Sequence, residues 1–343
     1  MERIERSLTS LTAQDRPSCN QNYIRHCRGF LAEARCLDYV QRYRKLIRGL
    51  DPRSLSCVSR ILGRMEHIAG LPDLPDGVMR PLDIWTSAEA AAIRRCHLEF
   101  DLQIIPLDHG IFAWRDYLLP IRRFEASVLY YRHQLGLLRH PERLRHKAVI
   151  DAGAFIGDSA LVLRRCSSGP IFCFEPLTEN FRLLQRTLQL NDCRNVHPVN
   201  KALGRAPGWT QVHGTGSRAA LDPARSPLPE LESQEVADTE VTTLDDFSRG
   251  LNLDIGLIKT DLEGFEQEFL AGARETIARN RPVLLISIYH NAADFFDIKP
   301  LIESWDLDYT FQISRPPLLD IYFETMLICE PDVRQTAAAP QPG

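Results

Sequence analysis

A carboxylate and two closely spaced glycines, Asp151, Gly153 and Gly157, end a short apolar run of the sequence. Apolar residues that break into glycines before an apolar helix predict a β-strand, a tight turn and a helix N-terminus. Glycines let the backbone of such a turn come close to a bound molecule, and the unpaired amides at the helix start can donate hydrogen bonds to it. This turn is therefore the first candidate for a cofactor site.

The spacing of the turn, D-x-G-x-x-x-G, differs from the G-x-G-x-x-G fingerprint of dinucleotide-binding proteins. Asp151 stands where that fingerprint has its first glycine, so the close backbone approach that a pyrophosphate needs is lost. A cation fits better, and S-adenosylmethionine carries a sulfonium and an ammonium but no phosphate. We expect Asp151 to attract this cofactor. A purely structural turn, with Asp158 capping the helix, is the alternative.

A second acid, Glu175, ends the next apolar run, residues 170–175, and lies 18 residues after Gly157. Ligands of open α/β sheets bind at the carboxyl ends of the strands, where an acid about 20 residues past the glycine turn accepts hydrogen bonds from ribose hydroxyls. We therefore expect Glu175 to hold the ribose of the cofactor.

Charged residues also follow two later apolar runs, with Lys259, Asp261 and Glu263 after the first and His290 after the second. A reaction at this edge of the sheet requires a group that takes a proton from the reacting molecule while that molecule is held in place. We expect Asp261 to be this base. His290 is the second candidate, since an unperturbed histidine titrates near neutral pH. Glu263 either enters the site or caps the helix that begins near residue 264.

Each of these residues also has a structural interpretation. Asp261 would act as a base only if burial raised its pKa, and it could instead hold the ammonium of the cofactor. His290 could cap a helix, and Lys259 could be an ion-pair partner rather than a substrate contact. An Asp-x-Glu pair without a clear third ligand is a poor metal signature. We therefore predict no metal and expect a chelator to leave activity intact.

The elements that must position these residues alternate between β-like and helical patterns. Near-continuous apolar strands are typical of a parallel sheet that is buried on both faces. Seven strands ending in an antiparallel hairpin favour a doubly wound α/β domain over a barrel, which needs eight regular units. The predicted strands are the run that begins at residue 148 and residues 170–175, 196–201, 256–261, 283–289, 309–314 and 323–329. The predicted helices are residues 159–163, 265–279 and 294–304 and an amphipathic helix that Thr178 caps and whose apolar residues extend to Leu190. Residues 204–246 are expected to hold short antiparallel pieces and a loop.

The first 122 residues are predicted to form a mainly helical N-terminal domain of unknown role. Apolar residues recur at helical spacing over residues 20–49 and 54–69, and Thr86 with Glu89 predicts a capping box for the next helix. Residues 124–138 alternate at first and then turn helical, and they could form part of the wall of an acceptor pocket.

The two halves of the chain carry opposite charge. Residues 1–147 contain 24 Lys and Arg against 17 Asp and Glu, whereas the remainder contains 17 against 28. This opposition could assist docking between the halves. A basic helical region could instead bind an anionic partner such as a lipid-linked glycan, a nucleotide sugar or nucleic acid. Scattered arginines on amphipathic helices are more often solvated faces, which is the interpretation we favour.

Composition favours an ordinary soluble protein over a membrane or disulfide-rich one. The 343 residues are 44% apolar and 25% charged, and no apolar run approaches the roughly 18 residues of a membrane span. The charged start argues against a secretion signal, and nine cysteines without a C-x-x-C pair signal neither a disulfide framework nor a zinc site. We therefore expect a cytoplasmic protein with a disordered tail over residues 333–343.

Several segments, in one order along the chain, resemble the FkbM family of S-adenosylmethionine-dependent methyltransferases. They are VIDAGAFIGDSALVL, FCFEP followed by TENF, LQLND, VTTLDDF, LIKTDLEGFEQEFLAGA, RPVLLISIYH and FETMLIC. The resemblance covers about residues 145–330, and the D-A-G-A turn and the K-x-D-x-E-G-x-E element are its most specific parts. It implies a Rossmann-like, seven-stranded class I methyltransferase sheet with helices on both faces, over a domain of residues 123–332. It also implies methyl transfer to an oxygen, typically a hydroxyl of a sugar, a glycan or a glycosylated metabolite.

The residues and the resemblance together predict one set of cofactor contacts and one set of catalytic residues. The cofactor set is Asp151, Gly153, Ala154, Gly157, Asp158, Glu175, Pro176 and Asn200, and the catalytic set is Asp261, His290 and Glu263. Two other functions stay open. They are an NAD-linked oxidoreductase, which the missing first glycine disfavours, and a binding protein that kept the fold but lost catalysis. The predicted partner is a small-molecule or glycan acceptor, with no nucleic acid and no membrane span, while the acceptor hydroxyl and the oligomeric state stay unknown.

Overall fold

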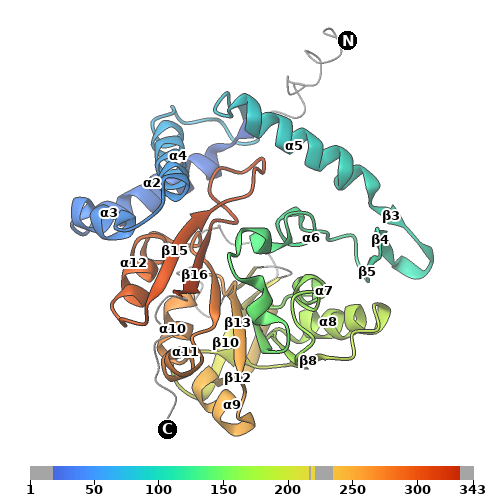
Figure 1. The fold of residues 1–343 in the computed structure, drawn as a ribbon. Coiled ribbons are helices and arrows are strands. Elements are labelled where there is room, and N and C mark those ends of the chain that lie inside the picture. The colour runs from blue at the N-terminus through green and yellow to red at the C-terminus, as the bar shows by residue number, and fades with distance from the viewer. Residues whose placement is uncertain (1–17, 216–217, 221–234, 333–343) are drawn as a thin grey trace.

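A seven-stranded sheet forms the centre of the computed structural model, which describes residues 18–215, 218–220 and 235–332 (Figure 1). Its strands are β6 (Ala148–Ala152), β7 (Ile171–Phe174), β8 (Val196–Val199), β13 (Ile255–Thr260), β14 (Val283–Ser287), β15 (Tyr309–Ser314) and β16 (Met326–Pro331). They lie in the order β15-β16-β14-β13-β6-β7-β8, and every pair is parallel except the two that β16 makes. The predicted α/β fold class and its antiparallel final hairpin are confirmed.

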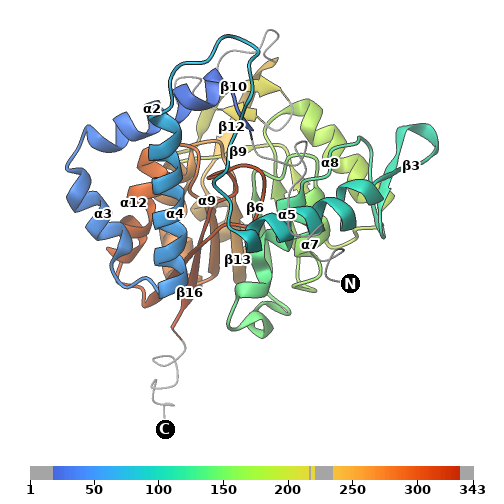
Figure 2. The same cartoon turned by 90° about the horizontal axis from the view of Figure 1, so that it is seen from above.

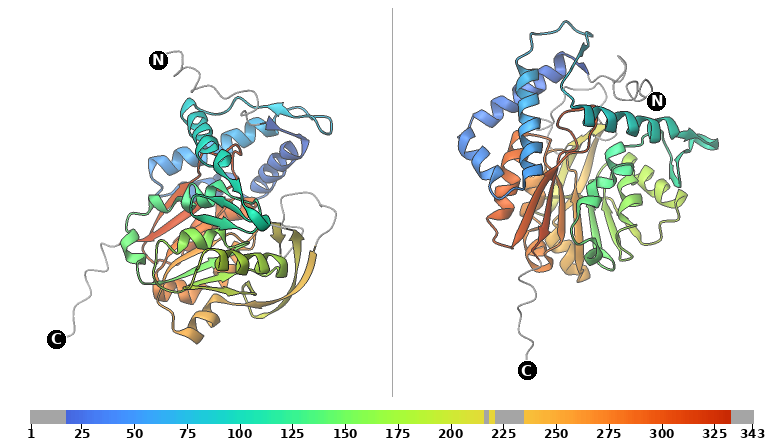
Figure 3. Two further views of the ribbon diagram at one scale, coloured as in Figure 1. Left: turned by 90° about the vertical axis from the view of Figure 1, so that its right-hand side faces the viewer. Right: turned by 45° about the horizontal axis from the view of Figure 1, so that its top comes forward.

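Successive residues of the central strands enter two different hydrophobic cores. Ile150 and Ile258 belong to one core, and their neighbours Val149 and Leu257 belong to the other. Side chains on a strand alternate between the two faces of a sheet, so both faces are buried. Helices cover both faces (Figures 2 and 3). One face carries α9 (Leu244–Leu251), α10 (Glu266–Ala271), α11 (Arg274–Asn280) and α12 (Ala292–Glu303), and the other carries α7 (Asp158–Leu163) and α8 (Thr178–Leu190).

The single helix predicted over residues 265–279 is wrong, because two shorter helices, α10 and α11, occupy this stretch. The break falls at Gly272 and Ala273. The backbone of Gly272 packs so closely on Gly204 that a Cβ atom there would overlap the Gly204 carbonyl oxygen. Tertiary packing of the chain against this glycine therefore overrides the helical pattern.

The N-terminal part of the chain is helical, as predicted. Its helices are α2 (Gln21–Arg35), α3 (Tyr39–Ile47), α4 (Pro52–Ala69) and α5 (Ser87–Glu99). The predicted capping box is present at the start of α5, where the Glu89 amide donates to Thr86 Oγ1 at 3.2 Å and the Thr86 amide donates to Glu89 Oε2 at 2.9 Å. A capping box of this kind stabilises the start of a helix by about 1 kcal/mol.

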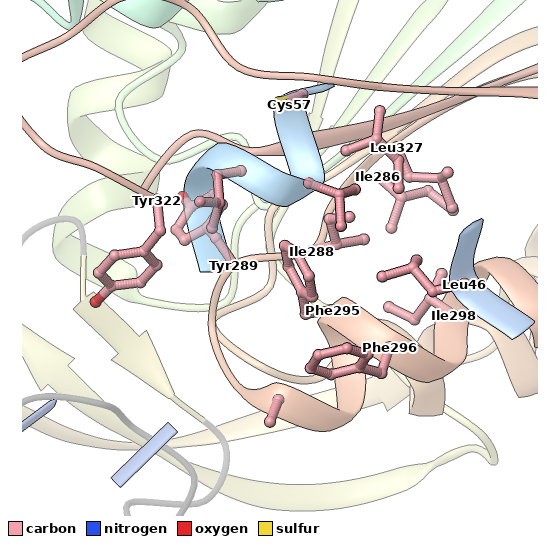
Figure 4. Packing of buried hydrophobic residues seen from close by; sticks show 14 of the residues in the cluster. Leu46, Cys57, Ile286, Ile288, Tyr289, Phe295, Phe296, Ile298, Tyr322 and Leu327 are labelled. Atoms are coloured by element: carbon pink, nitrogen blue, oxygen red, sulfur yellow. The ribbon is translucent and has the colours of Figure 1, made fainter. Parts of the chain in front are cut away.

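Helices α2, α3 and α4 share one hydrophobic core with the sheet and with α12. Figure 4 shows Leu46 of α3 beside Ile298 of α12. Arg42 of α3 pairs with Asp297 of α12 at 2.8 Å, so the opposite charges of the two halves meet at this contact. The core is thus continuous across residue 122, and the division of the chain into domains stays a prediction.

Short strands complete the described part of the chain. A second sheet has the order β11-β10-β12-β9 and contains β9 (Ala202–Leu203), β10 (Gly208–Thr215), β11 (Arg218–Ala220) and β12 (Glu235–Thr242). Its antiparallel pairs agree with the prediction for residues 204–246. The predicted tail, residues 333–343, lies outside the described residues. None of the helices in the described ranges combines the length and the apolar character needed to cross a bilayer.

Candidate functional site

A cavity of about 450 Å³ lies at the carboxyl edge of the central sheet. Volumes of about 300–1,000 Å³ are usual for small-molecule sites. Its walls come from the segments that follow β6, β7, β13 and β14 and from the turn before β16. The residues that line it include Arg123, Glu125, His133, Gly153, Phe155, Asp158, Glu175, Pro176, Lys259, Asp261, Glu263, Tyr289, Asp320, Phe323 and Glu324. Ligands of parallel sheets bind at this edge, so the cavity is where the sequence places a site.

The glycine turn after β6 forms one wall of the cavity. Gly153 has φ 80° and lies so close to β13 that a Cβ atom there would overlap the Asp261 carbonyl oxygen. Gly157 has φ 85° and packs against Leu184 of α8, and it does not line the cavity. Only glycine adopts such angles without strain, so both residues are required by the backbone itself.

Three of the predicted cofactor contacts lie away from the cavity. Ala154 is fully buried and its amide donates to the Phe174 carbonyl at 2.9 Å, so neither Ala154 nor Gly157 faces the cavity. The Asn200 side chain donates to the carbonyls of Glu175 and Pro176 at 2.8 and 3.1 Å. These contacts favour a structural role for the three residues, and their contact with the cofactor stays a prediction.

Asp151 also has a different place from the one predicted. It is fully buried within β6, directly opposite Lys259 in the register of β6 and β13. Lys259 Nζ lies 3.2 Å from Asp151 Oδ1, and the Ser159 hydroxyl donates to Asp151 Oδ2. Lys259 neutralises Asp151, and Asp151 does not line the cavity, so these contacts favour a structural role for Asp151. The structural interpretation of Lys259 as an ion-pair partner is the correct one.

The carboxylates beside Lys259 also keep its side chain positively charged. Burial alone would lower the pKa of this ammonium, but the carboxylates of Asp151 and Asp261 outweigh burial and raise the pKa above its usual value. Its Nζ also donates to the Gly153 carbonyl at 2.9 Å. Lys259 is therefore a permanent cation that holds the glycine turn against β13.

Glu175 lies at the end of β7, as predicted, and lines the cavity while only 3% exposed. Its carboxylate accepts from the amides of Phe155 and Leu177, each at 3.0 Å, and from Asn180 Nδ2 at 3.2 Å. Burial raises the pKa of Glu175 to about 7, with these donors partly opposing it. The donors fix the carboxylate at the cavity wall. Oε1 accepts two of them, whereas Oε2 accepts only the Phe155 amide and can still accept from a ligand hydroxyl.

Asp158 is the second acid of the cofactor set that faces the cavity. It is 3% exposed, and its Oδ1 accepts the Ser159 amide at 3.0 Å while Oδ2 has no hydrogen-bond partner in the structure. Burial first, and then the charge of Glu125, raise the pKa of Asp158 to about 7. A buried oxygen that lacks a donor is one that a cationic or hydroxyl-bearing ligand satisfies.

The structure places Asp261 and His290 next to each other. They form an ion pair rather than two alternative bases. His290 Nε2 lies 3.2 Å from Asp261 Oδ1, and His290 Nδ1 lies 3.2 Å from Glu266 Oε1. These are ion-pair contacts rather than aligned hydrogen bonds. The Tyr289 hydroxyl donates to Asp261 Oδ1 at 3.0 Å. His290 is 1% exposed, does not line the cavity and lies between two carboxylates.

The charges of this cluster disfavour both predicted bases. Burial alone would lower the pKa of His290, but the carboxylates of Glu266 and Asp261 raise it well above its usual value, so the imidazolium persists. Burial alone would raise the pKa of Asp261, but the contact with His290 and the charge of Lys259 lower it below its usual range. A charged imidazole cannot accept a proton, and so acidic a carboxyl is a weak base. The expectation that burial tunes Asp261 toward neutral pH is wrong.

The strand end that carries Glu263 departs from regular alternation. Glu263 has φ 52° and lines the cavity together with Asp261, so the two acids do not point to opposite sides. The residue that caps the turn is Glu266, which accepts the Leu262 amide at 2.6 Å and the Gly264 amide at 3.0 Å. Glu266 is the last acid of the K-x-D-x-E-G-x-E element, and its position there was the signal that the sequence offered for it.

Asp261, Glu266 and His290 are also close enough to share a metal ion, since one ligand atom from each lies within 4.8 Å of the others. The two nitrogens of His290 face different carboxylates, and Glu266 is occupied by backbone amides. A protonated His290 between two carboxylates explains this arrangement more simply than a metal ion bound by all three residues. The absence of a metal therefore stays a prediction, and the pairing of these residues with one another supports it.

Two segments close the other end of the cavity, and the sequence predicts only the one that contains His133. His133 is 4% exposed and lines the cavity, and burial first lowers its pKa to about 3, so it stays neutral. Asp320, Phe323 and Glu324 belong to the turn between β15 and β16. Their only sequence signal was the F-E-T segment of the resemblance, while residues 124–138 do contribute to the wall through His133, as expected.

Comparison with protein families places the cavity in a known context. Residues 151–313 match the family model described as methyltransferase FkbM domain. A curated relative, Methyltransferase 1 of Beauveria bassiana (strain ARSEF 2860), is 27% identical over 187 residues, which are 49% of this chain and 74% of that protein. The matched residues include Glu175, Lys259 and Asp261 and stop before β16.

Solved structures share the fold. Methyltransferase FkbM from Methylobacillus flagellatus KT aligns with a TM-score of 0.54 at 20% identity, over 87% of this chain and 60% of that chain. The present chain thus spans less than two thirds of that protein, and the match extends beyond the sheet into the N-terminal helices. An rRNA methylase from Streptococcus thermophilus aligns with a TM-score of 0.35 at 14% identity, over 58% of this chain and 92% of that one. The first alignment shows a common architecture, and the second is too weak to carry an argument.

Proposed function

We propose that the chain transfers a methyl group from S-adenosylmethionine to a hydroxyl oxygen of a sugar, a glycan or a glycosylated metabolite. The match of residues 151–313 to the model of the FkbM methyltransferase domain supports this proposal. The observation that carries the proposal is the buried Glu175 carboxylate, held by two amides at the cavity wall at the end of β7. The acceptor class rests on the family resemblance of the sequence motifs.

The residues of the cavity fit this cofactor. Glu175 would accept hydrogen bonds from the ribose hydroxyls, and apolar groups of Phe155, Leu203 and Val212 offer a surface for the adenine. The partnerless oxygen of Asp158 fits the ammonium of the methionine part. Bound in this way, S-adenosylmethionine supplies an electrophilic methyl group. The protein residues orient the acceptor beside it and exclude water.

Thermal melting with different cofactors shows which cofactor the protein binds, and this distinguishes a methyltransferase from an oxidoreductase. Ligand at 100 times its dissociation constant adds about 2.7 kcal/mol of stability, enough to raise the melting temperature by several degrees. We expect S-adenosylmethionine and S-adenosylhomocysteine to do so and NAD to have no effect. A rise with NAD alone would favour an oxidoreductase. Transfer of labelled methyl groups to glycan extracts would then separate an enzyme from a binding protein.

Cofactor binding is expected to depend on pH. Burial raises the pKa of Glu175 to about 7, so below neutral pH a proton competes with the ribose hydroxyls for the carboxylate. If binding requires the ionised form, S-adenosylhomocysteine should bind about tenfold more tightly at pH 8 than at pH 6. Isothermal titration calorimetry at both pH values measures this. Equal dissociation constants would show that Glu175 is already ionised at pH 6 or does not touch the ligand.

A chelator is expected to leave the methyl transfer rate unchanged. The three groups that could share a metal are already paired, with His290 between Asp261 and Glu266. Activity is measured after dialysis against EDTA and again after addition of Mg²⁺. Complete loss of activity that Mg²⁺ restores would instead assign a metal to this cluster.

A further inference from the structure

Glu324 lies at the acceptor end of the cavity, opposite the end that carries Glu175. Met326 of β16 pairs with Ser287, the last residue of β14, and the Ile288 amide donates to the Thr325 carbonyl at 3.0 Å. The turn that carries Glu324 therefore sits at the carboxyl end of β14. Strands β7 and β16 are four places apart in the sheet, which corresponds to about 19 Å at about 4.8 Å per strand. The cofactor and the acceptor thus bind at opposite ends of one cavity in this proposal.

Most other acids of the cavity are already committed to partners. Asp261 accepts from Tyr289 and pairs with His290, and Glu175 accepts from three donors. Asp320 accepts the amides of two following residues and the Tyr23 hydroxyl. Glu324 interacts with the side chain of Ser127, a neutral donor. Of these four acids, Glu324 thus has the most capacity for a proton.

The backbone at Glu324 is in a conformation that glutamate rarely adopts, with φ 63°. Residues held in the left-handed region persist only where their surroundings determine them, and they concentrate at functional sites. Here Asp320 Oδ1 accepts the amides of Tyr322 and Phe323 at 2.7 and 2.6 Å, and Arg315 Nε donates to the Phe323 carbonyl at 3.1 Å. The turn is therefore built to hold this carboxylate in one place.

The N-terminal helix α2 braces the same turn from outside. The Tyr23 hydroxyl donates to Asp320 Oδ2 at 2.7 Å and accepts the Ile321 amide at 3.2 Å, and the ring of His26 stacks on Tyr322 at 4.8 Å between centroids. This gives α2 a role in shaping the acceptor end of the cavity.

We propose that Glu324 is the general base that takes the proton from the acceptor hydroxyl. The inference rests on the proposed methyl transfer. The hydroxyl oxygen forms its bond to the methyl carbon while the carbon–sulfur bond breaks, and the electron pair of that bond stays on sulfur. The hydroxyl proton passes to the Glu324 carboxylate. The products are a methyl ether and S-adenosylhomocysteine, so atoms and charges balance.

The charges around Glu324 agree with this role. Burial first, and then the carboxylates of Asp261 and Glu125, raise the pKa of Glu324 to about 8, while Ser127 and the Lys259 ammonium oppose them. A base works best when its pKa lies near the working pH. The other charged groups of this wall are Asp158, Glu263, Asp320 and Arg123. Glu324 is thereby distinguished from Asp261, whose pKa is lowered.

The test is Glu324→Gln, assayed with labelled cofactor and the glycan extract that the wild-type protein methylates. We expect kcat to fall about 100- to 10,000-fold, while the dissociation constant for S-adenosylhomocysteine stays within about twofold of wild type. Glu324→Asp should recover part of kcat. Glu179→Gln, on an exposed residue of α8, is the matched control and should keep full activity. A Glu324→Gln enzyme with more than a tenth of wild-type kcat overturns the proposal.

A second variant checks the pH dependence. Wild-type kcat should rise with pH through about 8 as Glu324 loses its proton. Because the Glu125 carboxylate raises the pKa of Glu324, Glu125→Gln should move this rise to lower pH. A rise that stays at the same pH in Glu125→Gln, or that persists in Glu324→Gln, belongs to another group and contradicts the assignment.

A measurement without turnover keeps the inference separate from the proposed function. In protein with ¹³C-labelled glutamate carboxyls, the resonance that Glu324→Gln removes should titrate near pH 8. A midpoint near the ordinary value of about 4.3 overturns the proposal even if no acceptor is found. Failure of the wild-type protein to bind S-adenosylmethionine would instead refute the proposed function.

Discussion

Glu175→Ala should bind S-adenosylmethionine about 10- to 150-fold more weakly than the wild-type protein. Hydrogen bonds to a charged group contribute about 1.5–3 kcal/mol, which converts to this range of dissociation constants. The carboxylate is 3% exposed and lines the cavity, so no neighbouring side chain or bulk water replaces it fully. Isothermal titration calorimetry with S-adenosylhomocysteine gives the dissociation constant directly.

The same carboxylate also accepts the amides of Phe155 and Leu177, so the folded state of Glu175→Ala must be checked by circular dichroism and melting. Glu179→Ala is the matched control. Glu179 lies in the first turn of the adjacent helix α8 with 62% of its side chain exposed, and it should leave affinity unchanged. A folded Glu175→Ala protein with wild-type affinity would remove Glu175 from the cofactor site.

Lys259→Met should cost about 3–5 kcal/mol of the free energy of unfolding. The side chains of Lys259 and Asp151 are 3% and 0% exposed, and removing the ammonium leaves a buried carboxylate without its counter-charge. Breaking a buried ion pair from one side is strongly destabilising for this reason. The methionine keeps most of the volume, so the loss reports charge rather than a cavity. Urea denaturation measures it.

Lys147→Met provides the comparison, because it breaks a lysine–aspartate pair between the starts of the same two strands. Lys147 Nζ lies 2.8 Å from Asp254 Oδ1, but these side chains are 37% and 71% exposed. Exposed pairs contribute at most about 1 kcal/mol. Adding Asp151→Asn to Lys259→Met should recover part of the stability, since it removes the stranded charge. Equal losses of unfolding free energy in Lys259→Met and Lys147→Met would show that the buried pair contributes no more to stability than the exposed pair.

The sequence predicts the sheet and the edge at which the cavity lies, because both follow from local patterns. Apolar runs gave all seven strands of the central sheet, and Glu175 was located from its position at the end of one of them. The capping box at Thr86 is a contact between residues three apart, so spacing alone specifies it. Local spacing also explains why Gly153 was recognised correctly as part of the cavity wall.

The charges within the site could not be predicted in the same way. Asp151 was assigned to the cofactor because the register that sets it opposite Lys259, 108 residues later, is not visible in the sequence. The sequence offers His290 as the second candidate base because its two carboxylate neighbours come from a different segment of the chain. The same limit applies to Glu324, whose turn is held by Tyr23 from the opposite end of the chain.

A crystal structure of the protein with S-adenosylhomocysteine tests the central claim most directly. The account predicts that the ligand occupies the cavity at the carboxyl edge of the sheet, with its ribose hydroxyls within hydrogen-bond distance of Glu175 and its amino group near Asp158. A structure in which the ligand binds elsewhere, or in which side chains close this cavity and no ligand enters, would contradict it.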